Sequence, residues 1–138
     1  MSLNYLLDTN IISEALRPAP NPVVSHHLRQ YAQEIAIPAV VWHELWFGCL
    51  RLPVSKKRSV IESYLSTVVA KTMQILPYDS VCAAWHAAER ARLASIGLTP
   101  PFSDGQIAAI AAVNDLILVT FNIQDFADFA GLELATWR

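Results

Sequence analysis

Cysteine is scarce in this sequence, and its placement excludes the common cysteine-based sites. Cys49 and Cys82 are the only two, and neither belongs to a Cys-x-x-Cys pair or a cysteine–histidine run. A zinc site or a disulfide framework is therefore unsupported. Both cysteines lie in apolar helical segments, where a buried free thiol is the simplest expectation.

The sequence also lacks a long apolar run and a targeting segment. No stretch approaches the ~18 apolar residues of a membrane span, and the N-terminus has no basic region followed by an apolar one. We therefore expect a protein that makes no membrane contact. The reducing cytoplasm fits this expectation and the free thiols.

Positive charge is not in excess. The formal net charge is −2, and 16% of the residues are charged. Domains that bind nucleic acid through a general basic surface often have a pI above ~9, whereas the pI here is about 6.0. This argues against a generic nucleic-acid binder but leaves room for an enzyme that contacts a few phosphates.

Prolines and apolar runs divide the 138 residues into alternating strands and helices. Strands are expected at 4–7, 34–37, 73–76 and 116–119, with a further candidate at 132–137. Helices are expected at about 9–16, 24–31, 39–52, 55–68, 79–96 and 103–114. The alternation predicts one α/β domain over residues 1–138 with a largely parallel sheet. An apolar fraction of 54%, above the usual ~45–50%, favours a sheet covered on both faces, a partner surface, or both.

Several helix starts can be assigned from capping residues. Asp8 or Thr9 can cap the first helix, and Ser55 and Asp79 can cap two later ones. The sequence Ser103-Asp104-Gly105-Gln106 matches a capping box, S-x-x-Q. The helix after Ser55 is expected to carry Ile61, Leu65 and Val68 on its apolar face.

Four of the 12 acidic residues interrupt the most apolar parts of the chain, and they are Asp8, Glu44, Asp104 and Asp125. A carboxylate is costly to bury unless it is paired or bound to a metal. Asp8 and Asn122 follow expected strand ends, and parallel sheets bind ligands at that edge. The pattern predicts a shared carboxylate cluster, which suits a hard divalent cation.

Each acid also has a structural explanation. Asp8 can simply cap a helix, Asp104 can stabilise the dipole of its helix, and Asp125 can be a turn residue. Glu44 is harder to explain in this way, because its neighbours on the helix are Val41, Leu45 and Trp46.

The chain resembles a PIN domain of the VapC branch, the toxins of toxin–antitoxin pairs. The segments that carry the resemblance are Leu7-Asp8-Thr9-Asn10, the stretch around Glu44, Ser103 to Ala109, and Thr120 to Phe126. Their order and spacing match over essentially the whole chain, so the combination is specific although no single motif is diagnostic.

The resemblance implies a three-layer α/β/α fold with a five-stranded parallel sheet. It implies a homodimer with Mg²⁺- or Mn²⁺-dependent ribonuclease activity, inhibited by a VapB-like antitoxin whose C-terminal segment covers the acidic groove. Asp8, Glu44 and Asp104 match the three main metal-binding acids by motif position. The fourth position is open between Asn122 and Asp125.

Phosphodiester hydrolysis is the chemistry that this set suits, since carboxylates and water are the ligands that Mg²⁺ and Mn²⁺ prefer. Asp8 and Asp104 are expected to be direct ligands, and Glu44 to be a ligand or to accept a proton from the attacking water. Asp125 is a further catalytic candidate. The residues expected to support the cluster by hydrogen bonding are Thr9, Asn10, Ser103, Thr120 and Asn122.

Lys56, Lys57 and Arg58 open a helix, where cations oppose the helix dipole. They are candidates for contact with phosphate, and a solvated surface run is the alternative. An apolar stripe on an earlier helix is formed by Trp42, Leu45, Trp46 and Cys49. Core packing is its default role, and a dimer or antitoxin face is the other.

Two other functions are compatible with parts of the pattern. A haloacid-dehalogenase-like phosphatase also places an aspartate after its first strand, but that chemistry requires Asp-x-Asp and Asn10 occupies the second position. A degenerate PIN domain would only bind partners or nucleic acid, and the retained acids argue against it. The sequence has no readable code for the RNA target or for the number of metal ions.

Overall fold

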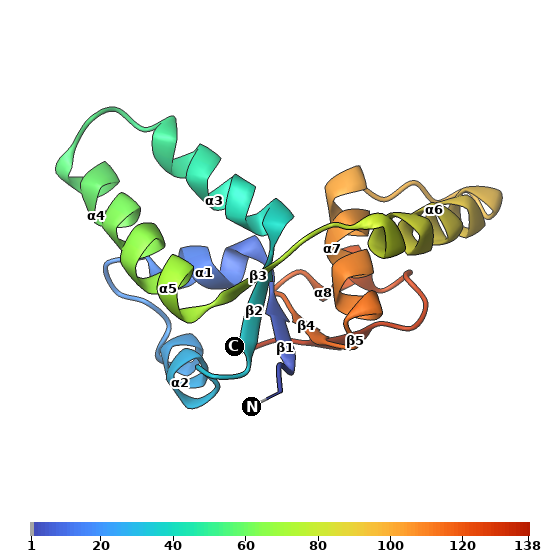
Figure 1. Cartoon of the computed structure of the whole chain (residues 1–138), viewed down its shortest axis with the longest axis horizontal. Helices are drawn as coiled ribbons and strands as arrows, with labels where there is room; N and C mark the ends of the chain where they lie inside the picture. The colour runs from blue at the N-terminus through green and yellow to red at the C-terminus, as the bar shows by residue number, and fades with distance from the viewer. Residues whose placement is uncertain (1) are drawn as a thin grey trace.

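A five-stranded parallel sheet forms the centre of the molecule (Figure 1). The computed structural model describes residues 2–138. The strands are β1 (Tyr5–Leu7), β2 (Ile35–Pro38), β3 (Gln74–Leu76), β4 (Ile117–Val119) and β5 (Glu133–Ala135). Their order across the sheet is β3-β2-β1-β4-β5, and every neighbouring pair is parallel. The fifth strand, a candidate in the sequence, is therefore confirmed.

Helices cover both faces of this sheet. They are α1 (Thr9–Ala15), α2 (Pro22–Gln30), α3 (Ala39–Leu50), α4 (Lys56–Tyr64), α5 (Ala70–Thr72), α6 (Ser80–Ser95), α7 (Phe102–Val113) and α8 (Ile123–Phe126). The chain runs from β1 to β3 in one direction across the sheet and then returns to β4 and β5. Because crossovers between parallel strands are right-handed, α1 to α5 and α6 to α8 lie on opposite faces, as Figure 1 shows. The expected α/β/α architecture is confirmed.

The central strands are buried on both sides, which accounts for the high apolar content. Leu6 and Leu7 of β1, Ile37 of β2, and Leu118 and Val119 of β4 have no exposed surface. The burial of each such side chain contributes about 1.5–3 kcal/mol to the stability of the folded state. Between residues 2 and 138, no helix has the length and apolar character that a membrane crossing needs.

The helix after Ser55 departs from the expected pattern at a π-helical turn, Leu65–Val69. There the N–H of Ala70 donates to the carbonyl of Leu65, five residues back. The wider turn shifts the apolar face by one position, so Val69 is fully buried while Val68 is 37% exposed. The prediction that Val68 belongs to the apolar face is therefore wrong.

The predicted caps at Asp8, Ser55 and Asp79 are confirmed, because each side chain accepts a backbone N–H at the start of its helix. The prediction of a capping box at Ser103 is wrong. Helix α7 begins one residue earlier, and the carbonyl of Pro101 accepts from the N–H groups of Asp104 and Gly105 at 3.1 and 3.2 Å. Pro101 has an extended backbone and starts the helix without a side-chain cap, which leaves Ser103 inside the first turn.

Helices α6 and α7 approach closely where His86 meets Gly105. A Cβ atom on Gly105 would overlap the imidazole ring of His86. That ring is held in place: it is buried, its Nδ1 lies 2.8 Å from the Tyr78 hydroxyl, and it packs on Phe102 with 4.7 Å between ring centroids. Gly105 therefore permits the close approach that fixes the start of α7, including its neighbour Asp104.

Replacing Gly105 by alanine is expected to destabilise the protein by about 1–3 kcal/mol, the usual effect of overpacking, reduced by about 1 kcal/mol from the better helix propensity of alanine. Urea unfolding measures the change. In a His86→Ala background the same substitution is expected to lower the free energy of unfolding by less, because the ring that the new methyl group would contact is absent. Equal costs in the two backgrounds would contradict the role of this contact.

Candidate functional site

The topology places a crevice at the carboxyl ends of β1 and β4. These strands are neighbours in the centre of the sheet, and the chain leaves them toward opposite edges. Such a switch point is where open α/β sheets bind ligands. Asp8 directly follows β1 and Thr120 directly follows β4, so both residues lie at this crevice.

Asp8 is the buried member of the expected cluster, with 9% of its surface exposed. Its Oδ1 accepts the N–H of Thr9 at 2.8 Å, and its Oδ2 accepts the hydroxyl of Thr120 at 2.9 Å. Burial raises the pKa of Asp8 above its usual range, and the charges of Asp125 and Glu44 add to this, while the two hydrogen bonds oppose it. Each carboxylate oxygen keeps a lone pair for another partner.

Thr120 and Asn10 connect Asp8 to the segment after β4. The Thr120 hydroxyl, which donates to Asp8, accepts the backbone N–H of Asn122 at 3.0 Å. The Asn10 side chain accepts the N–H of Phe121 at 3.3 Å. Of the residues expected to support the cluster, Thr120 contacts Asp8 through its side chain and Thr9 through its backbone N–H. The Asn10 side chain bonds the backbone of Phe121, and Asn122 takes part through its backbone N–H.

Asp104 lies in the first turn of α7 and is partly buried. Burial raises the pKa of Asp104 to about 6, and repulsion from Asp8, Asp125 and Glu44 adds to the shift. All four acids are therefore within electrostatic reach of one another. The three ion pairs formed among residues 2–138 involve none of them, so their mutual repulsion has no paired cation to offset it.

Glu44 and Asp125 reach the crevice from α3 and α8, and both are exposed. The expectation that burial makes these two acids costly is wrong. Of the apolar neighbours of Glu44 on α3, Val41 and Leu45 are buried and Trp46 is partly buried, but Glu44 itself remains exposed. Asp125 belongs to a short helix that the sequence pattern did not predict, rather than to a turn.

Two cavities flank the acids. One, of about 340 Å³, is lined by Leu98, Thr99, Pro100, Pro101, Asp104, Asp125 and Asp128. The other, of about 400 Å³, lies between α1, α3 and α4 and includes Thr9, Glu44 and Lys57 in its walls. A larger cavity of about 460 Å³ lies at the opposite edge of the sheet, beside Asn4 and Asp115, so size does not identify the site.

The donor atoms at the crevice suit a hard divalent cation. Carboxylate oxygens are the ligands that Mg²⁺ and Mn²⁺ prefer, and the raised pKa of Asp104 shows repulsion that a cation would relieve. Between residues 2 and 138, however, no three acidic, histidine or cysteine side chains converge into a ready ligand set. Binding would therefore draw the side chains of Glu44 and Asp125, which are exposed, toward Asp8 and Asp104.

The sequence alone did not indicate which residues surround Asp104 and Asp125. Asp128 lines the cavity beside Asp104 and Asp125, and Glu89 and Arg92 of α6 contact the loop that follows α8. Glu89 and Arg92 are far from Asp125 along the chain, and this separation hides the proximity of α6 to the loop. The only signal was the Asp-Phe-Ala-Asp-Phe spacing at 125–129, which is too short to assign a role.

Comparison with known proteins gives the family. The family model for the PIN domain matches residues 5–132. The chain is 33% identical to the toxin FitB of Neisseria gonorrhoeae, covering 96% of each chain, and 30% identical to the ribonuclease VapC2 of Rickettsia felis, covering 96% of this chain and 97% of the other.

Solved structures agree. The FitAcB complex of Neisseria gonorrhoeae contains a chain 33% identical to this one, with a TM-score of 0.85 and coverage of 94% and 95% of the two chains. VapBC2 of Rickettsia felis, bound to a DNA fragment from its promoter, contains one 29% identical over the full length of both, with a TM-score of 0.84. The chain belongs to the PIN-domain family.

Replacing Asp104 by asparagine is expected to stabilise the metal-free protein at neutral pH. The pKa of Asp104 is raised from its ordinary value of 3.8 to about 6, so its contribution to stability is complete below pH ~4 and is lost as the pH rises through ~6. After discounting for solvent screening, the gain at pH 7.5 is about 1 kcal/mol, or roughly 3–6 °C in Tm.

Thermal unfolding at pH 4 and pH 7.5 tests this prediction. Glu133→Gln, at the amino end of β5 and away from the acids, is the control, and its Tm should equal that of the wild type. The difference between Asp104→Asn and the wild type should vanish at pH 4. A clear drop in Tm at pH 7.5 would instead show that Asp104 mainly stabilises the start of α7.

Proposed function

We propose that this protein hydrolyses RNA phosphodiester bonds at a divalent metal site formed by Asp8, Glu44 and Asp104. The protein is a ribonuclease toxin of the VapC type, like the relatives that match it over nearly its whole length. The observation that supports the site is the repulsion at Asp104, whose pKa is raised to about 6 by burial and by three other carboxylates at the same sheet edge.

Asp8 and Asp104 are the proposed direct ligands, and Asp125 rather than Asn122 is the proposed fourth acid. The charge of Asp125 acts on both Asp8 and Asp104, whereas Asn122 contacts the cluster through its backbone N–H on Thr120. When bound, Mg²⁺ or Mn²⁺ supplies Lewis-acid chemistry, because it acidifies water and neutralises charge on the phosphate oxygens.

The side chains of the chain itself have separate tasks in this scheme. Thr120 and the N–H of Thr9 fix the carboxylate of Asp8, so that its free lone pairs face the crevice. Glu44 is exposed at the mouth of the groove between α1, α3 and α4, where it can accept the proton of the attacking water. The water oxygen bonds to phosphorus, and the bond from phosphorus to the leaving oxygen breaks.

Lys57, with Lys56 beside it, is the proposed contact for RNA phosphates. Lys57 lines the groove that also contains Thr9 and Glu44, and Lys56 is exposed. Arg58 has intramolecular partners instead: its Nε donates to Glu62 at 2.8 Å and its Nη1 to the carbonyl of Leu52 at 3.1 Å. We therefore assign Arg58 to the stability of α4 rather than to the substrate.

A cognate VapB-like antitoxin is the proposed partner, since the similar structures are complexes of this kind, such as FitAB and VapBC2. The groove between α1, α3 and α4 has apolar walls that include Leu16, Leu45 and Ile61, and it ends at Glu44. An antitoxin segment in this groove would block the acids. We also propose a homodimer, an antitoxin that supplies the contacts to DNA, and action in the cytoplasm, where RNA is available.

The two other functions now carry less weight. Asn10 binds the backbone of Phe121, so its position does not serve as the second acid of a phosphatase. The activity of a degenerate PIN domain that only binds would not change with a chelator or with loss of Asp8. The RNA-cleavage experiment that follows tests this difference.

RNA cleavage by the purified protein is expected to require Mg²⁺ or Mn²⁺, to stop in EDTA, and to fall by at least about 100-fold in Asp8→Asn, because a ligand is lost. A mixed pool of structured RNA is the substrate, and Asp115→Asn at the opposite sheet edge is the control. Metal-independent cleavage that survives in Asp8→Asn would point to a contaminant. Absence of cleavage by folded wild type, tested over RNA of several classes, would favour a binding function.

Charge reversal at Lys57 is expected to raise KM for RNA by about 10-fold with little change in kcat, because a phosphate contact contributes to binding in both ground and transition states. Lys71→Glu on α5, also an exposed lysine, is the matched control. If the two variants have the same KM as the wild type, the phosphate role of Lys57 is rejected.

A further inference from the structure

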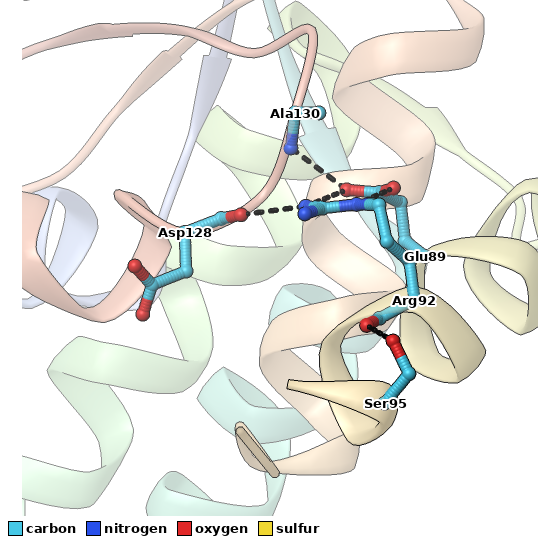
Figure 2. Close-up of polar contacts among 5 residues, drawn as sticks. All are labelled: Glu89, Arg92, Ser95, Asp128 and Ala130. Carbon is cyan, nitrogen blue, oxygen red and sulfur yellow. Dashed lines mark hydrogen bonds and ion pairs between the residues drawn. The ribbon is translucent and has the colours of Figure 1, made fainter. Parts of the chain in front are cut away.

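Helix α6 binds the loop that follows α8 through an ion pair, Glu89–Arg92 (Figure 2). The Nε of Arg92 donates to Glu89 Oε2 at 2.8 Å, and its Nη2 donates to Glu89 Oε1 at 2.9 Å. The same Nη2 donates to the carbonyl of Asp128 at 2.8 Å, and Glu89 Oε1 accepts the N–H of Ala130 at 2.7 Å. The pair therefore binds one acceptor and one donor of the loop backbone.

These contacts involve the backbone of the loop rather than the side chain of Asp128. Figure 2 shows the carboxylate of Asp128 pointing away from Arg92, which binds only the carbonyl of that residue. The hydrogen bonds from Arg92 hold the pKa of Glu89 below its usual range, so the pair remains ionised at neutral pH. One loop side chain is also anchored, because Phe129 is buried and its ring lies 6.3 Å from that of Trp85 on α6.

The loop is continuous with the helix that carries Asp125. Helix α8 has four residues and no side-chain cap, and a helix this short is not stable without tertiary contacts. Its position is fixed by the buried side chain of Phe126 and by what holds its two ends, which are Thr120 and Asn122 on one side and the loop at Asp128–Ala130 on the other.

Helix α6 also packs along α7, which carries Asp104. The Glu89–Arg92 pair thus connects the helix that supports Asp104 to the loop that supports Asp125. Both acids line the cavity of about 340 Å³, and both are negatively charged in the same small space. Like charges repel. Asp125 is exposed in a four-residue helix, so fixing the loop that follows this helix limits the movement of Asp125 away from Asp104.

We propose that Glu89 and Arg92 are positioning residues that hold Asp125 beside Asp104 against their repulsion, and that they thereby set the affinity of the site for its divalent cation. This inference rests on the proposed function, because it assumes that Asp125 takes part in the metal site. Glu89 and Arg92 act through the loop backbone in this proposal and are not proposed as metal ligands.

Binding of Mn²⁺ to the full chain, followed by the electron paramagnetic resonance signal of free Mn²⁺, tests the proposal without using activity. Arg92→Ala is expected to weaken Mn²⁺ binding about 10-fold, the usual effect of losing a supporting contact. Arg92→Lys, which can still donate to the Asp128 carbonyl, should recover part of the affinity. In an Asp125→Asn background, Arg92→Ala should cause no further loss.

The pair Arg58–Glu62 on α4 provides the matched control. It has the same 2.8 Å ion-pair distance and also donates to a backbone carbonyl, that of Leu52, but it does not support an acid of the site. Arg58→Ala is expected to lower Tm about as much as Arg92→Ala while leaving the Mn²⁺ affinity unchanged. This separates loss of stability from loss of positioning.

The outcomes distinguish the two levels of the proposal. Wild-type protein that binds no Mn²⁺ would overturn the metal site and the positioning role with it. Wild type that binds Mn²⁺, with Arg92→Ala lowering Tm but not the affinity, would overturn the positioning role alone. Equal losses of affinity with and without Asp125 would show that Arg92 does not act through that residue, and would also overturn the proposal.

Discussion

Repulsion between carboxylates is the constraint on which this structure depends. Asp8, which follows β1, and three acids from α3, α7 and α8 share one edge of the sheet. The pKa of Asp104 is raised to about 6 by burial and by the charges of the other three. A fold that only needed to be stable would not gather these charges. The surrounding structure must therefore hold them, and it does so through polar contacts and through packing.

Those contacts are of two kinds. Asp8 is held directly, by the N–H of Thr9 and the hydroxyl of Thr120. Asp104 is held by packing, since the absence of a side chain on Gly105 lets α7 approach His86. The sheet topology supplies the common location, because β1 and β4 are adjacent at the switch point. Rigid placement of like charges is a usual feature of metal sites, where stability is given up for function.

The fold could be predicted from the sequence to a large extent, because strand and helix periods were clear and the prolines ended elements at the expected places. The strand order could not be predicted, since it depends on the pairing of β1 with β4, whose partners lie more than 100 positions apart. Two local features were also not predicted. The π-helical turn at Leu65–Val69 moves Val69 into the core, and Pro101 rather than Ser103 precedes the first residue of α7. Both depend on backbone geometry that residue spacing does not encode.

The sequence allowed the four acids to be grouped as one candidate site, but it did not predict how buried each of them is. The positions of Asp8, Glu44, Asp104 and Asp125 were read from motif order, and the structure brings all four within electrostatic reach. Burial was inferred from sequence neighbours, which fails for Glu44 because a helix presents adjacent residues to different sides. The contact of Glu89 and Arg92 with the loop after α8 could not be predicted, since an ion pair of this spacing on a helix is ordinary until the loop beside it is known.

The contact between Asp8 and Thr120 has a consequence for synthesis of the chain. It joins residues 112 positions apart, and β4, which brings Thr120 to the crevice, inserts between β1 and β5 in the sheet. A growing chain on the ribosome therefore has no complete acidic crevice until β4 has left the exit tunnel and paired with β1. The proposed site cannot cleave RNA before this late pairing has formed.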